Sequence, residues 1–172
     1  MKKFIALLFA GTLLSAGVFA AEINVNGVFK GAKEGGKNSP RWILRTDAEG
    51  KVEFVKGEKA PLALKVVPGK TKISCISKAK INAKAGDILT VSSNGKGKGI
   101  FQLSAYVYGK GGKYLTTLQG KKLSATEKNT LFTQNLKVAA SGEIAHVTAV
   151  IVVQPSSDIT FEDVKVQHET AK

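Results

Sequence analysis

Short runs that alternate apolar and polar residues recur along most of the chain. The clearest pair ends it: residues 145–153 are rich in valine, isoleucine and threonine, and residues 159–166 alternate apolar and polar side chains. A Pro-Ser-Ser-Asp sequence at 155–158 separates them. Because β-branched residues favour a half-buried pleated surface and Pro, Ser and Asp favour turns, the pattern predicts a closing β-hairpin.

The same pattern predicts strands along the rest of the chain, separated by clusters of Gly, Asn, Asp and Pro. The predicted strands are 23–30, 42–46, 52–55, 62–67, 72–77, 81–83, 87–92, 100–108, 113–118, 130–137, 146–153 and 160–166. The glycine-rich segment 94–99 predicts a tight hairpin connection, with a mobile, positively charged loop as the alternative. Short strands at this spacing predict an all-β fold, an antiparallel sandwich or jelly roll.

The first twenty residues predict an export signal. Lys2 and Lys3 precede an apolar stretch over residues 4–18, and Val18 and Ala20 place small side chains at the cleavage positions. The apolar stretch is shorter than the roughly 20 residues that a membrane span needs. We therefore predict a signal peptide at 1–20 and a single β-sandwich domain at 21–172 with a short polar C-terminal tail. The mature chain is then secreted or periplasmic, without a transmembrane segment.

The mature chain is strongly basic. Two of the 26 lysines and arginines lie in the predicted signal, so 24 remain against 13 acidic residues, a formal charge of +11. A lysine-rich surface protects sheet edges and keeps a β protein soluble, and it also attracts polyanions. An exported protein meets acidic polysaccharides and cell-surface polymers. We predict such a polymer as the partner, and no nucleic acid.

The single cysteine, Cys75, excludes an intrachain disulfide. It lies in the strand-like run 71–77, which predicts a small buried thiol rather than a reactive one. A domain of this length buries a substantial hydrophobic core, so the core has to provide the stability.

Motifs for catalysis are weak. His146 and His168 are the only histidines, and no His or Cys spacing typical of a metal site occurs. Pro-Gly-Lys-Thr at 68–71 lacks the first glycine of a phosphate-binding loop and joins two predicted strands, so it predicts a turn. We predict a non-catalytic protein. A small hydrolase is the alternative, because glycosidases need only two carboxylates.

The predicted strand 100–108 provides a candidate binding face. Its apolar residues point to one side, and its hydrogen-bonding and aromatic residues point to the other; the second set is Gln102, Ser104, Tyr106 and Tyr108. Amphipathic rings beside hydrogen-bonding groups suit the apolar faces and hydroxyls of sugars. The alternative is that the two tyrosines cover the sheet without binding a ligand.

Five segments, taken in order, resemble one family of sandwich domains. They are Asn26-Gly-Val-Phe, Pro40-Arg-Trp, Ala85-Gly-Asp-Ile-Leu-Thr-Val-Ser, Phe101-Gln-Leu-Ser-Ala-Tyr-Val-Tyr and Ile159-Thr-Phe-Glu-Asp-Val-Lys-Val. They resemble the galactose-binding-like jelly roll, specifically carbohydrate-binding modules of the four/nine type. The resemblance covers nearly all of residues 21–172 and rests on short motifs.

The resemblance implies two further site assignments. Trp42 matches the family's tryptophan, which packs in the core or edges the cleft, so it joins the candidate carbohydrate-binding residues. Members often hold a structural calcium, which makes Asp163 the candidate metal ligand. Val28 and Lys30 stand where the family usually has acids, and Leu89 replaces a tyrosine. Apart from this calcium we expect no cofactor.

Two hypotheses follow. The first is an exported, non-catalytic carbohydrate-binding protein that holds an acidic polysaccharide on a sheet face through Trp42, Gln102, Tyr106 and Tyr108. The second is a structural or adhesive cell-envelope protein that uses the same sandwich for protein contacts.

Overall fold

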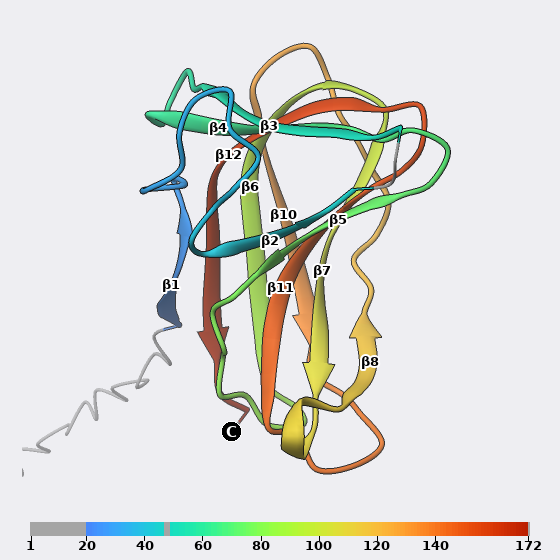
Figure 1. Cartoon of the computed structure of the whole chain (residues 1–172). Helices are drawn as coiled ribbons and strands as arrows, with labels where there is room; N and C mark the ends of the chain where they lie inside the picture. The colour runs from blue at the N-terminus through green and yellow to red at the C-terminus, as the bar shows by residue number, and fades with distance from the viewer. Residues whose placement is uncertain (1–19, 47–48, 172) are drawn as a thin grey trace, which may run out of the picture.

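The computed structural model describes residues 20–46 and 49–171 (Figure 1). In these residues twelve strands and one short 3₁₀ turn follow one another. They are β1 (Ala21–Gly27), β2 (Trp42–Arg45), β3 (Lys51–Lys56), β4 (Leu62–Val67), β5 (Ile73–Ser77), β6 (Ile88–Lys98), β7 (Ile100–Tyr108), η1 (Lys110–Gly112), β8 (Tyr114–Leu118), β9 (Leu123–Ser124), β10 (Thr130–Lys137), β11 (His146–Val153) and β12 (Asp158–Glu169).

The strands form two antiparallel sheets of six strands each. One, the β6 sheet, has the order β10-β6-β12-β4-β3, with β1 paired to β12; the other, the β7 sheet, has the order β2-β5-β11-β7-β8, with β9 paired to β7. Figure 1 shows β11 and β7 in one layer with β12, β6 and β10 in the layer behind them. The predicted all-β jelly-roll sandwich is confirmed.

Both sheets turn their apolar faces into one core. Phe101 from the β7 sheet meets Phe161 from the β6 sheet edge-on, with ring centroids 5.1 Å apart, and both rings are fully buried. Cys75 belongs to this core, and burial raises the pKa of its thiol to about 12. The prediction of a buried thiol is confirmed.

The two predicted hairpins at 94–99 and 153–159 instead cross from one sheet to the other. Residues 154–157 carry the chain from β11 in the β7 sheet to β12 in the β6 sheet, and Gly99 carries it from β6 to β7. Most of the glycine-rich segment belongs to β6 itself. The hairpin expectation was wrong because sequence periodicity shows which face of a strand is apolar but not which strand lies beside it.

Ser157 holds these two crossings together. Its hydroxyl accepts a hydrogen bond from the Ile100 N–H at 3.1 Å and donates one to the Ile100 carbonyl at 3.3 Å. The Gln154 N–H donates to the same carbonyl at 2.9 Å. Gly99 has a φ of +110°, and a Cβ there would lie 2.2 Å from the Ser157 hydroxyl oxygen, so glycine is required.

A buried carboxylate fixes the loop between β3 and β4. Glu162 is fully buried, and it accepts hydrogen bonds from the backbone N–H groups of Glu58 at 3.1 Å, Lys59 at 2.7 Å and Ala60 at 3.0 Å. Successive N–H groups that converge in this way form an anion-binding concavity. Glu162 is thus a structural residue, and its acidic neighbour in sequence, Asp163, has a different environment.

The C-terminal segment, which the sequence predicts to be a short polar tail, continues the fold. Strand β12 runs to Glu169, and the His168 ring contacts the buried Asp87 carboxylate at 2.8 Å. Asp87 also accepts hydrogen bonds from the N–H groups of Lys84 at 2.8 Å and Ala171 at 2.9 Å. The sequence analysis missed this because the carboxylate that holds the tail lies 81 residues away along the chain.

The predicted signal peptide falls mostly on residues 1–19, which lie outside the described residues, so it stays a prediction. Within 20–46 and 49–171 no helix is long and apolar enough to span a membrane.

Replacing Asp87 with Asn should destabilise the protein in a pH-dependent way. Burial by itself raises the pKa of Asp87, but the hydrogen bonds from Lys84, Ala171 and His168 outweigh it and leave the pKa below its usual value. The carboxylate therefore contributes stability above about pH 4, and this contribution is lost as the pH falls through the lowered pKa. We expect Asp87→Asn to cost about 1–3 kcal/mol at pH 7 in urea denaturation, and less at pH 3.

The matched control is Asp158→Asn, because that carboxylate forms an exposed ion pair with Lys65 at 3.3 Å. Its loss should stay within about 0.5 kcal/mol. An equal loss at both pH values for Asp87→Asn would contradict the role assigned to the carboxylate.

Candidate functional site

The outer face of the β7 sheet carries the aromatic residues of the candidate site. Tyr106 from β7 is half-buried, and its hydroxyl donates to the Ser74 hydroxyl of β5 at 3.3 Å. Its ring packs on a small apolar cluster of Ile76, Val150 and Val152, which lies outside the main core. The sheet thus has a second apolar layer on its outer side, with a tyrosine over it.

Three more rings extend this surface. Tyr108 stacks on His146 of β11, with centroids 5.0 Å apart and planes 15° from parallel. Tyr114 of β8 contacts Tyr106 and Tyr108 edge-on, at 5.8 Å and 6.2 Å. We call these four residues the tyrosine face. Tyr114 is 53% exposed, so part of its ring is open to a ligand.

Two members of this face were predictable from the sequence and two were not. Tyr106 and Tyr108 lie on the outer face, as their alternation on β7 predicts. Tyr114 was missed because a register shift in the pairing of β7 with β8 brings it opposite Tyr108. His146 pairs directly with Tyr108 across β11 and β7, a neighbourhood that only the strand order reveals.

A shallow hollow of about 260 Å³ adjoins the tyrosine face. It is lined by Ile43, Ile76, Ser77, Lys78, Lys80, Tyr108, His146 and Thr148. Burial and the positive charge of Lys80 lower the pKa of His146. The imidazole is therefore neutral at neutral pH, whereas two ammonium groups line the same hollow.

Acidic residues are unevenly distributed between the two sheets. The described strands of the β7 sheet contain no aspartate or glutamate, whereas those of the β6 sheet contain Glu22, Glu53, Asp158, Glu162, Asp163 and Glu169. The outer face of the β7 sheet consequently offers ring faces, hydroxyls and cations. This composition suits the binding of a hydroxylated or anionic ligand.

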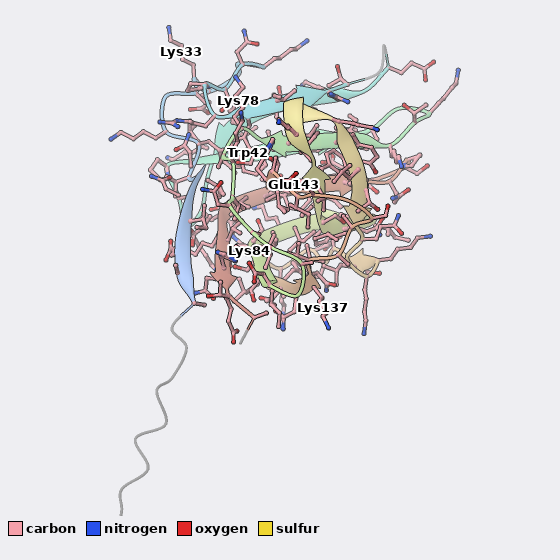
Figure 2. The ribbon with its side chains drawn as sticks, turned by 90° about the horizontal axis from the view of Figure 1, so that it is seen from below. Lys33, Trp42, Lys78, Lys84, Lys137 and Glu143 are labelled. Carbon is pink, nitrogen blue, oxygen red and sulfur yellow. The ribbon has the colours of Figure 1, made fainter. Side chains whose placement is uncertain are left out.

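Trp42 does not belong to this surface. Its side chain is 2% exposed, its ring packs edge-on against Phe29 at 5.8 Å, and its indole N–H donates to the Asn26 carbonyl at 3.2 Å. Figure 2 shows Trp42 among the strands, whereas the Lys33 side chain reaches the periphery. The prediction that Trp42 contacts a sugar is corrected, because its ring has no open face on which a sugar can stack.

Gln102 faces outward as predicted, but its amide is already engaged. Its NH₂ group donates to the Gly120 carbonyl at 2.8 Å, and its carbonyl accepts from Gln154 at 3.3 Å. Ser104 accepts from the Gly120 N–H at 3.1 Å. Because β8 ends at Leu118, Gln102 and Ser104 replace the strand pairing that is missing at Gly120. Gln102 is 9% exposed and has a structural role here.

The residues around Asp163 do not fit a calcium cage. Asp163 lies in a bulge of β12 with a φ of 50°, and its carboxylate is paired with Lys165 at 3.2 Å. Lys30 and Lys165 line the adjoining hollow, and the Asn26 side-chain carbonyl already accepts from the Lys30 N–H at 2.9 Å. Calcium takes six to eight oxygen ligands, most of them anionic or carbonyl. Besides the paired Asp163 carboxylate only that of Glu22 lines the hollow, and the ammonium groups of Lys30 and Lys165 there oppose a cation.

Comparisons with known proteins support the fold. No family model matches the chain, and no curated protein matches it. Among solved structures, an arabinose-bound GH51 α-L-arabinofuranosidase matches 90% of this chain with a TM-score of 0.63 at 11% identity, but the chain spans only 27% of that enzyme. A Stig cyclase from Fischerella sp. TAU matches 90% of this chain and 100% of its own, with a TM-score of 0.62 at 12% identity.

A third similar structure is the family 11 carbohydrate-binding module of a cellulosomal cellulase from Clostridium thermocellum. It matches 82% of this chain and 95% of its own, with a TM-score of 0.57 at 7% identity. The chain therefore has the jelly-roll fold of carbohydrate-binding modules, as the sequence resemblance predicted. At these identities the likeness concerns the fold alone.

Trp42 should behave as a core residue in solution. Because it is the only tryptophan, its emission reports on one site, and we expect a blue-shifted maximum that resists acrylamide quenching. Trp42→Ala should lower the free energy of unfolding by about 3–5 kcal/mol in urea denaturation. Tyr114→Ala, at an exposed ring, is the control and should cost less than about 1 kcal/mol. A readily quenched tryptophan would return Trp42 to the candidate surface.

Proposed function

We propose that this protein is an exported, non-catalytic, carbohydrate-binding protein that holds a polysaccharide on the tyrosine face. The observation that carries the proposal is the cluster of Tyr106, Tyr108, Tyr114 and His146 on the outer side of a sheet whose strands bear no carboxylate. The fold that it shares with carbohydrate-binding modules supports the same function.

The chemistry of the face suits sugar rings. The C–H faces of a pyranose pack on aromatic rings, and the hydroxyls at the ring edge exchange hydrogen bonds with polar side chains. Tyr114 supplies the open ring, and Tyr106 is fixed by its hydrogen bond to Ser74. A face that is held in place before binding loses little conformational entropy when it takes a ligand.

The distribution of charge favours an acidic polysaccharide. Five lysines on strands of the β6 sheet form ion pairs, among them Lys65 with Asp158, Lys96 with Glu58 and Lys165 with Asp163. Around the β7 sheet, Arg45, Lys78 and Lys80 have no ion pair among the described residues. Unpaired positive charge thus lies beside the tyrosine face, next to strands that carry no carboxylate.

The protein-contact alternative has its own surface. Strand β10 is the edge of the β6 sheet, and Leu131 on it is 62% exposed. An exposed edge strand presents unpaired backbone groups to another chain. If this edge drives assembly, the protein associates with increasing concentration in light scattering, and Leu131→Lys abolishes the association.

A glycan array at low and physiological salt tests the proposal. We expect binding to acidic polysaccharides that weakens as salt rises, because charge contacts are screened. Tyr114→Ala should reduce affinity about tenfold while changing stability little, since one stacking contact is worth roughly 1 kcal/mol or more. Leu131→Ala removes an exposed apolar side chain from the other sheet and should leave affinity unchanged. If no glycan on the array is bound at either salt concentration, the proposed function is wrong.

We further propose that the fold is independent of calcium. Ammonium groups occupy the surroundings of Asp163, so a metal chelator should leave the thermal midpoint unchanged within about 1 °C. A calcium site filled at a hundred times its Kd would add about 2.7 kcal/mol, which thermal denaturation detects readily. A midpoint that falls with chelator and recovers with calcium would contradict this.

A further inference from the structure

The hollow beside the tyrosine face has a rigid basic wall. Its two lysines flank Ala79, whose N–H donates to the Ser77 hydroxyl at 3.1 Å and whose carbonyl accepts from Thr148 at 3.4 Å. The Lys78 N–H donates to the Arg41 carbonyl at 2.9 Å. Ile81, the residue after Lys80, exchanges two backbone hydrogen bonds with Val147, each with an N···O distance of 2.9 Å. The backbone that carries both lysines is therefore tied to β5, to β11 and to the residue that precedes β2.

Both lysines line the same hollow because they stand two residues apart in an extended, tethered segment. Residues i and i+2 of an extended chain point to the same side. The floor opposite them is apolar and aromatic, from Ile43, Ile76 and Tyr108. At about 260 Å³ the hollow is smaller than the pockets of ~300–1,000 Å³ that enclose whole small ligands. It suits one unit of a longer chain.

The electrostatics of the hollow favour an anion. Burial is the main cause of the lowered pKa of His146, and the ammonium of Lys80 lowers it further because it disfavours a second positive charge at the imidazole. The same potential attracts a negative group. The cations that face this region are Lys78 and Lys80 on the segment after β5 and Arg45 on β2, with Tyr108 and Tyr114 on β7 and β8 as neutral neighbours. Glu143, in the loop before β11, is the nearest acid along the chain to His146, and it forms no ion pair with any residue of 20–46 and 49–171.

We propose that this hollow is the subsite for the anionic group of an acidic sugar, a carboxylate or a sulfate, held by Lys78 and Lys80 with the sugar ring against Tyr108. This inference rests on the proposed function and names the part of the surface that selects charged chains. The tyrosine face supplies stacking to any polysaccharide, and the lysine wall adds affinity for acidic ones.

The test compares matched ligands on matched variants by isothermal titration calorimetry at physiological salt. The ligands are an oligogalacturonate, its methyl ester and a sulfated galactan oligosaccharide. The variants are Lys78→Ala/Lys80→Ala and the control Lys33→Ala/Lys137→Ala, which removes the same charge from other parts of the surface. Figure 2 shows both control lysines at the margins of the molecule, on opposite sides.

We expect the wild-type protein to prefer an acidic oligosaccharide over the neutral ester by at least about tenfold, which corresponds to roughly 1.4 kcal/mol. The Lys78/Lys80 variant should lose this preference and keep its affinity for the ester, and the control should keep both. The oligogalacturonate and the sulfated arm identify which anionic group is bound.

Histidine titration by NMR gives a second readout. An anion bound beside His146 should raise the pKa of this imidazole, because the negative charge offsets that of Lys80. His168 contacts Asp87 outside the hollow, so its NMR signals serve as the internal reference.

The outcomes separate the two proposals. If no oligosaccharide binds, the proposed function fails. If the oligogalacturonate and its ester bind equally, or if the Lys78/Lys80 variant retains the preference for the acid, the anion subsite is wrong. Carbohydrate binding on the tyrosine face is then still supported.

Discussion

The structure depends on the joint between two sheet crossings, where Ser157 bonds to both backbone groups of Ile100. Side chains alternate along a strand, so the residue at which β7 begins decides which of its faces enters the core. The hydrogen bonds between Ser157 and Ile100 fix where β7 begins and thereby which of its side chains face the core. Phe101 then points inward onto Phe161, and Tyr106 and Tyr108 point outward. A shift of one residue would bury the tyrosines and expose the phenylalanine.

Buried polar groups extend this control to the loops and ends. The Glu162 carboxylate holds three consecutive N–H groups of the β3–β4 loop, and Asp87 holds the end of β12. Both acids support the β6 sheet, where most ion-paired lysines also lie. The β7 sheet contains hydroxyls and rings in place of acids, so the positive charge beside it has no internal partner. The difference in charge between the two sheets follows from the positions of the carboxylates.

The comparison structures limit what the fold implies about function. The same sandwich occurs in a carbohydrate-binding module, within an arabinofuranosidase and in a cyclase, so the fold by itself does not select among binding and catalysis. Only the side chains on the surface can distinguish a binding protein from an enzyme. Here it offers exposed Tyr114, the Tyr108–His146 stack and two lysines on a tethered segment, the groups on which the proposed binding of sugars rests.

Much of the fold was predictable from the sequence, because alternation and turn residues are local properties of the chain. The strands at Thr130–Lys137 and His146–Val153, the buried Cys75 and the outward direction of Tyr106 and Tyr108 all follow from neighbouring residues. Other features depend on which strands lie side by side. The burial of Trp42, the use of Gln102 to bond Gly120, and the meeting of Tyr114 and His146 with Tyr108 join segments that are distant along the chain. Periodicity determined which side of each strand is apolar, whereas only the packing of the two sheets decided which side chains are covered, which are already bonded and which are left to meet a ligand.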